Sequence, residues 1–253
     1  MIFYDTGVMM VDDLQIIDAG KGWIVAHKPA LLSVHNEPGR DLLSLLSRKM
    51  EDDRALCEAV GYEKSSRISP VHRLDRETSG VMILSFERGV AAWFSRQFEE
   101  RRVKKTYLVL VHGVFDMTIG DECFWEFPLS PEAGGRNRPE GSGRKAPCKT
   151  RVTLLDSSPH YSLLACEPIT GRQHQIRRHA KLSGHPVLGD ERYCPTRALN
   201  YIKTRTSFNR LGLHSHRVSI TLPGEQAATP FSSPCPHLFL EMVKQDKACG
   251  APR

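Results

Sequence analysis

Apolar residues recur along the chain with two different spacings, and these predict a series of strands and helices. Short runs rich in Val, Ile and Leu between turn residues predict strands, and apolar positions three and four residues apart predict amphipathic helices. The strands are expected at 14–18, 23–27, 80–85, 105–111, 150–155, 161–167 and 213–222, and the helices at 42–50, 88–101, 174–183 and 236–244. Because strands mostly follow strands, with single helices between them, this order predicts an α+β fold on a mixed or antiparallel sheet.

Local signals add detail at two places in the chain. Asp41 stands just before the helix at 42–50 and offers an N-capping carboxylate. The segment Pro131–Pro147 contains four glycines and three prolines among several charges, which indicates a loop or mobile insertion rather than a packed element. No repeat of 20 to 50 residues recurs, so a solenoid or propeller is not expected.

Composition indicates a soluble globular protein with a polyanionic partner. The chain has 253 residues, of which 40% are hydrophobic and 25% charged, and this length fits one large domain or two small ones. A net charge of +6 favours an anionic partner such as nucleic acid. Basic residues gather at 101–105, 136–151 and 172–181, where the alternative is an ordinary solvated surface.

The sequence also argues against several protein classes. It contains no run of about 18 apolar residues and no signal peptide pattern at its start, so we expect it in the cytoplasm and not in a membrane. Its seven cysteines are scattered and form no C-x-x-C pair. We therefore expect neither a disulfide scaffold nor a structural zinc site, and no metal.

The loop before the expected strand at 80–85 has the densest chemistry in the chain. Residues 70–80 read PVHRLDRETSG, with two arginines around one aspartate. A carboxylate flanked by Arg73 and Arg76 would be held ionised, and Asp75 could then act as a nucleophile on an electrophilic carbon. The alternative is a structural aspartate that caps a turn in a salt-bridged loop.

Several segments together resemble one enzyme family. The stretch His72–Gly80, HRLDRETSG, resembles the H-R-L-D-x-x-T-S-G signature of the RluA-type RNA pseudouridine synthases. Further segments resemble this family in the right order: WIVAHKP at 23–29, KTYLVLV at 105–111, EPITGRQHQIR at 167–177, HPVLGD at 185–190 and LGLHSH at 211–216. The resemblance covers about Leu14 to Leu240, and a long signature with ordered partners is far more specific than a lone motif.

This resemblance implies a fold, a reaction and a partner. The implied fold is a single α+β catalytic domain at 12–245, with a long, mostly antiparallel mixed sheet, flanking helices and an RNA-binding cleft. Residues 1–11 and 246–253 are expected to be short tails. The implied reaction converts uridine in ribosomal or transfer RNA to pseudouridine without a cofactor or metal, and we expect a monomer. The target RNA is not indicated, because recognition depends on RNA shape.

The resemblance also assigns roles to individual residues. Asp75 matches the essential aspartate, Tyr107 the active-site tyrosine and Arg177 the arginine that pairs with the aspartate; attack by Asp75 on the sugar or on the base both remain open. Without the motif, Tyr107 would be taken for a core aromatic and Arg177 for part of a basic helix face. The residues expected to bind substrate are Arg73, His72, Arg172, His174, Gln175 and Arg178, with Arg73 as a wedge beside a flipped base.

Two other functions remain open at this point. The first is an RNA-binding protein of the same fold that has lost catalysis, although Asp75, Tyr107 and Arg177 are all present. The second is a sugar hydrolase with Asp75 and Glu77 as paired carboxylates. Carboxylates so close in sequence need not face each other across a bond, and the chain is poor in the aromatic residues that stack on sugars.

Overall fold

The structure, a computed structural model, describes residues 14–250, and the chain divides into two compact units. The first unit contains the chain up to Val103 together with Ser219–Ser233. The second contains Lys104–Val218 and the chain from Pro234 onward. The tail expected at 1–11 lies outside the described residues. The single domain expected at 12–245 stays a prediction.

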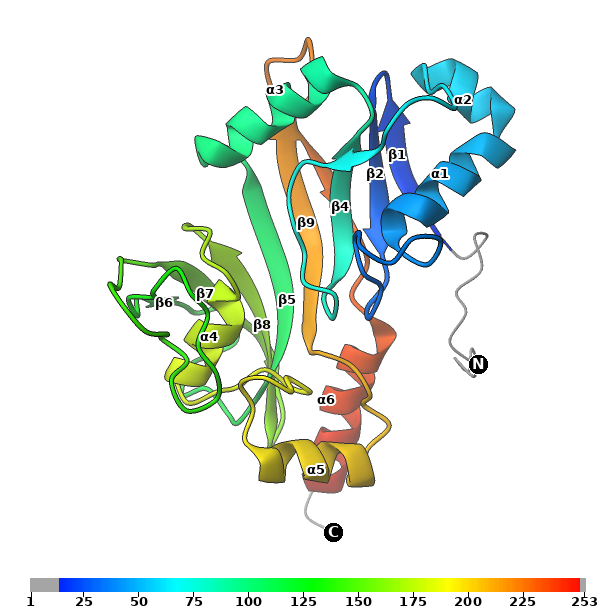
Figure 1. The fold of residues 1–253 in the computed structure, drawn as a ribbon. Coiled ribbons are helices and arrows are strands. Elements are labelled where there is room, and N and C mark those ends of the chain that lie inside the picture. Colours follow the sequence, from blue (N-terminus) through cyan, green and yellow to red (C-terminus); the bar gives the residue numbers. More distant parts are fainter. Residues whose placement is uncertain (1–13, 251–253) are drawn as a thin grey trace. The chain divides into compact units, whose positions relative to one another are not determined.

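The first unit is built on antiparallel strands with helices around them (Figure 1). Its elements are β1 (Ile16–Gly20), β2 (Trp23–Lys28), α1 (Leu42–Asp52), α2 (Arg54–Val60), β3 (Ser69–Pro70), β4 (Ser79–Ser85), α3 (Arg88–Glu99) and β10 (Ala228–Ser232). Strand β2 pairs antiparallel with β1 on one side and with β4 on the other, and every residue of β4 is buried. The Trp23 ring meets Phe94 edge-on at 6.5 Å and Phe231 at 5.8 Å, so both chain segments of this unit share one core.

Capping explains where helices α1 and α2 of the first unit begin. Asp41 accepts a hydrogen bond from the Ser44 amide at 2.9 Å, which confirms the expected cap of α1. Helix α2 was not expected from the sequence. Asp53 caps it through the Leu56 amide, and Gly61 ends it in a left-handed conformation with φ of 74°.

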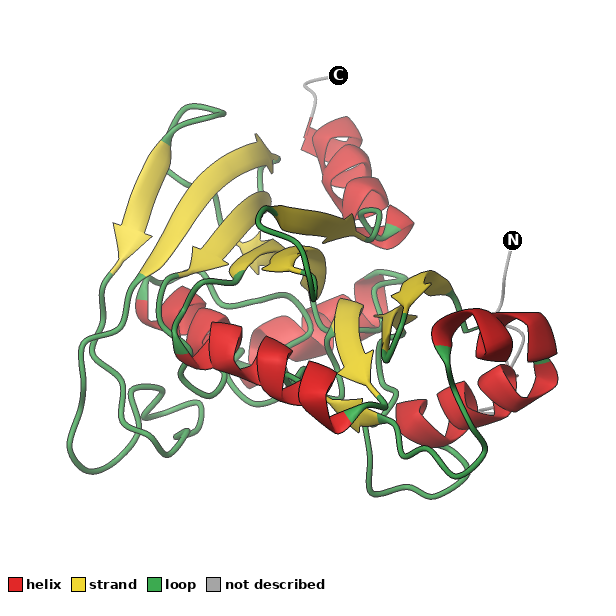
Figure 2. Ribbon diagram, turned by 90° about the horizontal axis from the view of Figure 1, so that it is seen from above, coloured by secondary structure: helices red, strands yellow, loops and turns green. Residues whose placement is uncertain are grey.

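The second unit is an antiparallel sheet with a helix on each face (Figure 2). Its elements are β5 (Lys104–His112), β6 (Glu122–Trp125), β7 (Thr150–Ser157), β8 (Tyr161–Pro168), α4 (Gln175–Leu182), α5 (Thr196–Arg205), β9 (Leu213–Thr221, whose last three residues belong to the first unit) and α6 (His237–Gly250). Four strands lie in the order β5, β8, β7, β6. Val109 and Val111 pack with α4, whereas Leu108 and Leu110 pack with α6, because alternate residues of a strand point to opposite faces.

Short elements account for most differences from the sequence prediction. Strands β3, β6 and β10 and helix α5 were not expected, and the last helix runs to Gly250 instead of ending at 244. Within residues 14–250, no helix combines the length and the apolar character that crossing a membrane requires.

The segment Pro131–Pro147 is a loop, as expected, but it is packed rather than mobile. Three arginines from the following chain and from the loop itself hold it in place. Arg192 donates to the carbonyl oxygens of Ala133 and Gly134 at 2.8 and 2.9 Å. Arg136 donates to the Glu191 carbonyl at 2.9 Å, and Arg178 binds the carbonyls of Pro139 and Glu140. The segment is therefore fixed through its backbone carbonyls and through the Arg136 side chain.

A buried lysine at the end of β2 connects two loops of the first unit. The Lys28 side chain is fully buried, and its ammonium donates to the carbonyl oxygens of Pro29, Leu32 and Arg76 at 2.9, 2.7 and 2.9 Å. A buried ammonium needs such partners because it has left water. The contact with Arg76 joins the end of β2 to the loop that contains Asp75.

A buried histidine joins α4 to the sheet of the second unit. The His179 ring lies between the Thr150 hydroxyl and the Phe127 carbonyl oxygen, with nitrogen to oxygen distances of 3.0 Å on both sides. Burial lowers the pKa of His179 to about 4, and the hydrogen bond to Phe127 offsets only part of this effect.

We expect Lys28→Met to destabilise the protein by about 3 kcal/mol, because it leaves carbonyl oxygens buried without their cationic donor. The measurement is urea unfolding followed by fluorescence. Lys21→Met, an exposed lysine at the β1–β2 turn, is the control and should change stability little. Equal stability of the two variants would contradict the role given to Lys28.

We expect stability to fall as the pH drops from about 6.5 towards 4. In this range His179 binds a proton in the unfolded chain but stays neutral in the folded chain, where it is buried. Above about pH 6.5 the contribution is fully present. The slope from one such histidine is at most about 1.4 kcal/mol per pH unit. Urea titrations at pH 7 and pH 5 should show a smaller loss for His179→Gln than for the wild type. His35→Gln, at an exposed loop position, should keep the wild-type loss.

Candidate active site

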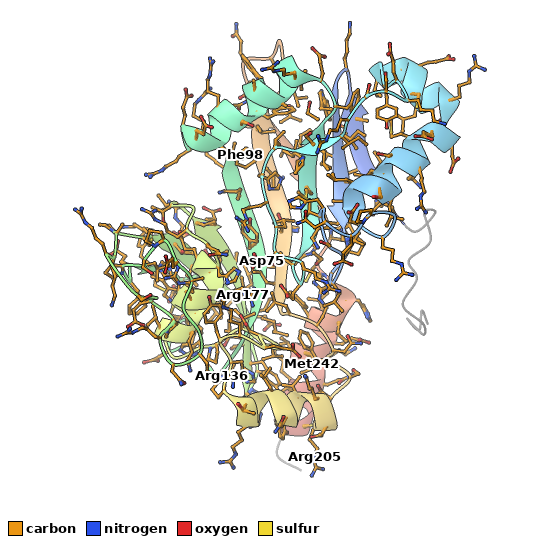
Figure 3. The ribbon with its side chains drawn as sticks, viewed as in Figure 1. Asp75, Phe98, Arg136, Arg177, Arg205 and Met242 are labelled. Atoms are coloured by element: carbon orange, nitrogen blue, oxygen red, sulfur yellow. The ribbon has the colours of Figure 1, made fainter. Side chains whose placement is uncertain are left out.

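Asp75 stands at the start of a tight turn directly before the buried strand β4 (Figure 3). The Thr78 amide donates to the Asp75 carbonyl oxygen at 3.0 Å and closes this turn, while the Asp75 side chain is half-buried. Gly80 follows with a φ of 115°, a backbone conformation that favours glycine. The carboxylate is therefore presented by a short loop that a rigid strand supports.

The two arginines around Asp75 have different environments. Arg76 donates from Nε to the Leu31 carbonyl at 3.1 Å, and its own carbonyl accepts from Lys28. Arg73 is exposed. Both arginines are exposed; Arg76 fastens the loop to the segment that follows β2, and Arg73 is accessible to a large ligand.

His72 is held in place by contacts with β4 and α3. Its Nε2 accepts a hydrogen bond from the Ile83 amide at 3.0 Å, so this nitrogen carries no proton. The His72 ring stacks on Phe98 of α3 with centroids 4.9 Å apart and planes 24° apart. These contacts indicate that His72 fixes the loop to the neighbouring elements.

In the second unit, a buried carboxylate fixes Arg177 on helix α4. Arg177 donates from Nε and Nη2 to the two carboxylate oxygens of Asp190, at 2.7 and 2.9 Å, and both side chains are buried. Asp190 also accepts from the amides of Arg192 and Tyr193. Gly189, with a φ of 67°, makes the turn that presents Asp190. The guanidinium plane of Arg177 is thus oriented in advance.

The residues around the start of α4 are of two kinds, those that hold the local structure and those that are exposed. Gln175 is buried and joins the Thr170 hydroxyl, the Arg172 amide and the Lys149 carbonyl. His174 has a left-handed backbone with φ of 51°, and its Nδ1 lies 3.0 Å from the Tyr193 hydroxyl. The Arg172 side chain is exposed. Of these residues, Arg172 has the exposed charge that suits a phosphate.

Arg178 differs from the expectation that it contacts substrate. Its side chain is fully buried, and it donates to the carbonyl oxygens of Ser130, Pro139, Glu140 and Gln173. Because its guanidinium has no exposed surface, Arg178 has no group available to contact a substrate. Arg178 therefore connects α4 to the loop at 131–147.

Tyr107 lies on β5, opposite Cys166 of β8. Its side chain is half-buried and packs against the cluster that contains Val109, Val152 and Leu164. Tyr107 thus packs on the core of the second unit, as expected if it were a core aromatic residue.

Two residues of this site were missed by sequence reasoning. Lys28 and Asp190 each stand in a segment that carried the resemblance, and no role was assigned to them. Both could have been found as charged residues inside short motifs. Lys28 directly follows the expected strand at 23–27, and Asp190 directly follows a glycine. Across residues 14–250, no three His, Cys, Asp or Glu side chains gather in a way that could hold a metal ion.

Comparisons with known proteins match this chain over most of its length. Residues 22–182 match the family model described as RNA pseudouridylate synthase. The chain is 28% identical to the tRNA pseudouridine synthase C of Pasteurella multocida, over 91% of this chain and 95% of that protein. It is 32% identical to the ribosomal large subunit pseudouridine synthase C of Vibrio vulnificus, over 83% of this chain but only 62% of that protein.

Solved structures give the same fold. The human RNA pseudouridylate synthase domain containing 1 matches with a TM-score of 0.71 at 23% identity, over 91% of this chain and 87% of that chain. The human RNA pseudouridylate synthase domain containing 4 matches with a TM-score of 0.70 at 22% identity, over 91% of this chain and 92% of that chain. The α+β pseudouridine synthase fold expected from the sequence is confirmed. With the family model covering both the Asp75 loop and the segment that ends at Arg177, the chain belongs to the RluA-type RNA pseudouridine synthases, a family of isomerases.

Proposed function

We propose that this protein converts uridine to pseudouridine in transfer or ribosomal RNA, with Asp75 as the nucleophile. The observation that carries the proposal is the Asp75 turn, which Lys28 and Arg76 hold before β4 in a chain of this family. The reaction breaks the bond between the ribose and a ring nitrogen, turns the base, and rejoins it through a ring carbon. A carboxylate suits this sequence because it can form and later release a covalent intermediate.

Arg177 and Tyr107 are the proposed partners of Asp75 in catalysis. Asp190 binds Nε and Nη2 of Arg177 and fixes the plane of its guanidinium, and this oriented guanidinium would bind the nucleophilic carboxylate and orient it. The ring of Tyr107 would stack on the uracil, and its hydroxyl would move a proton during the rearrangement. We assign no cofactor to this reaction.

RNA binding is proposed for the exposed basic side chains. Arg73 would fill the space beside the flipped uridine, since a base inside a stack is out of reach. Arg172, Arg138 and Arg144 are exposed in the basic segments and would contact phosphates. His72, His174 and Gln175 would act by shaping these loops.

The RNA target is identified by carbodiimide-based pseudouridine mapping of total RNA with and without the gene. Rescue with the wild type and with Asp75→Ala separates catalysis from RNA binding. A site that disappears and returns only with the wild type supports the proposal. If no site changes, the inactive RNA-binding alternative is preferred, and crosslinking would then identify the bound RNA.

We expect Asp75→Asn to abolish pseudouridine formation while RNA affinity stays within a few fold, because the amide keeps the shape but cannot act as a nucleophile. Product is measured on the mapped RNA by mass spectrometry, and affinity by fluorescence anisotropy. Asp52→Asn, at an exposed position of α1, is the matched control and should keep full turnover. Turnover by Asp75→Asn would remove Asp75 from this role.

We expect RNA affinity to fall steeply with salt, because binding several phosphates releases counterions. Each lost phosphate contact should reduce the slope of log affinity against log salt concentration by about 0.7 to 0.9. Anisotropy titrations at several KCl concentrations should show this reduction for Arg144→Gln. Arg54→Gln, an exposed arginine outside the basic segments, should keep the wild-type slope. A slope near zero for the wild type would contradict the proposed phosphate contacts.

A further inference from the structure

Leu31, in the loop after β2, has a backbone conformation that leucine rarely adopts. Its φ is 66°, and among the described residues the other non-glycine positions with positive φ are Asn36, Arg101 and His174. Asparagine tolerates this conformation through its short polar side chain, whereas a bulky apolar residue there is an outlier. The conformation lowers the folding constant about 5- to 30-fold relative to an unstrained residue.

The same loop exposes the Leu31 side chain to solvent. Its exposed fraction is 55%, although neighbouring Leu32 is buried. The backbone around it is fixed, because Lys28 binds the carbonyls of Pro29 and Leu32 and Arg76 binds the carbonyl of Leu31 itself. The structure therefore holds a strained backbone in place and directs an apolar side chain outward. Strain of this kind in a fixed loop is characteristic of positions that contact ligands.

The surroundings of Leu31 indicate which ligand it contacts. Arg76, which binds the Leu31 carbonyl, directly follows Asp75 in the chain. An RNA that brings a uridine to Asp75 must take that base out of its stack, and this uncovers the faces of the neighbouring bases. A leucine side chain has no hydrogen-bonding group, so it suits the face of a base and not a phosphate or a ribose hydroxyl.

We propose that Leu31 packs against the uncovered face of a base next to the target uridine and thereby positions the RNA at Asp75. This inference rests on the proposed function and adds a substrate contact to it. The ligand class is an unstacked nucleobase in RNA. The expected loss on removing such a contact is about tenfold in affinity, near the lower end of what stacking of a base on an aromatic side chain contributes.

The first experiment compares Leu31→Ala with Ile119→Ala, a control at another apolar position, which is 59% exposed. The substrate is a short RNA with the mapped uridine and a 2-aminopurine beside it. We expect Leu31→Ala to raise KM about tenfold, to change kcat little, and to reduce the 2-aminopurine fluorescence change on binding. The control should match the wild type. Wild-type values of KM and fluorescence for Leu31→Ala would overturn the inference.

The second experiment separates strain from substrate contact. Leu31→Gly adopts the positive φ without penalty, so its folding constant should rise about two- to tenfold while its KM rises as for Leu31→Ala. A glycine variant no more stable than the wild type would contradict the strain argument. Failure of the wild type to modify any RNA would instead overturn the proposed function, and this inference with it.

Discussion

One buried ammonium group determines how the first unit presents its chemistry. Removing a charge from water costs several kcal/mol unless polar partners replace the water, and three backbone carbonyls do so for Lys28. These carbonyls belong to two loops, and the lysine stands 48 residues before Arg76 in the chain. Because the buried ammonium needs all three carbonyls, Lys28 couples the position of the strained Leu31 loop to that of the Asp75 turn.

The second unit contains a similar arrangement, in which the buried group that collects hydrogen bonds is negatively charged. Here a buried carboxylate, Asp190, accepts from Arg177 and from two backbone amides. Such a pair is weak evidence for stability, because desolvation offsets much of the attraction. What it provides is a fixed orientation of the guanidinium before any substrate binds, and an arginine that is already ordered loses less entropy when it meets its ligand.

Sequence reasoning predicted the Asp75 loop, the Asp41 cap and the main strands, because these follow from local rules of turn chemistry and apolar spacing. It failed on Arg178, which follows Arg177 on the same short helix. A basic pair suggests a solvated face, and this assumes that a helix touches the core on one side only. Helix α4 is covered on a second side by the loop at 131–147, and Gln175 to Ala180 are all buried as a result. The φ of Leu31 is equally hidden from the sequence, since tertiary hydrogen bonds impose it.

The packed loop at 131–147 has one further consequence. Arg178 and Arg192 bind it through backbone carbonyl oxygens, and any amino acid supplies a carbonyl. Its path is therefore largely independent of which side chains it displays, apart from Arg136, which binds the Glu191 carbonyl, and tight positions such as Gly134 and Gly141, where an added Cβ would meet neighbouring atoms. Exposed positions such as Arg138 and Arg144 can change during evolution without refolding the loop. The side chains on this surface can therefore change while the path of the loop stays the same.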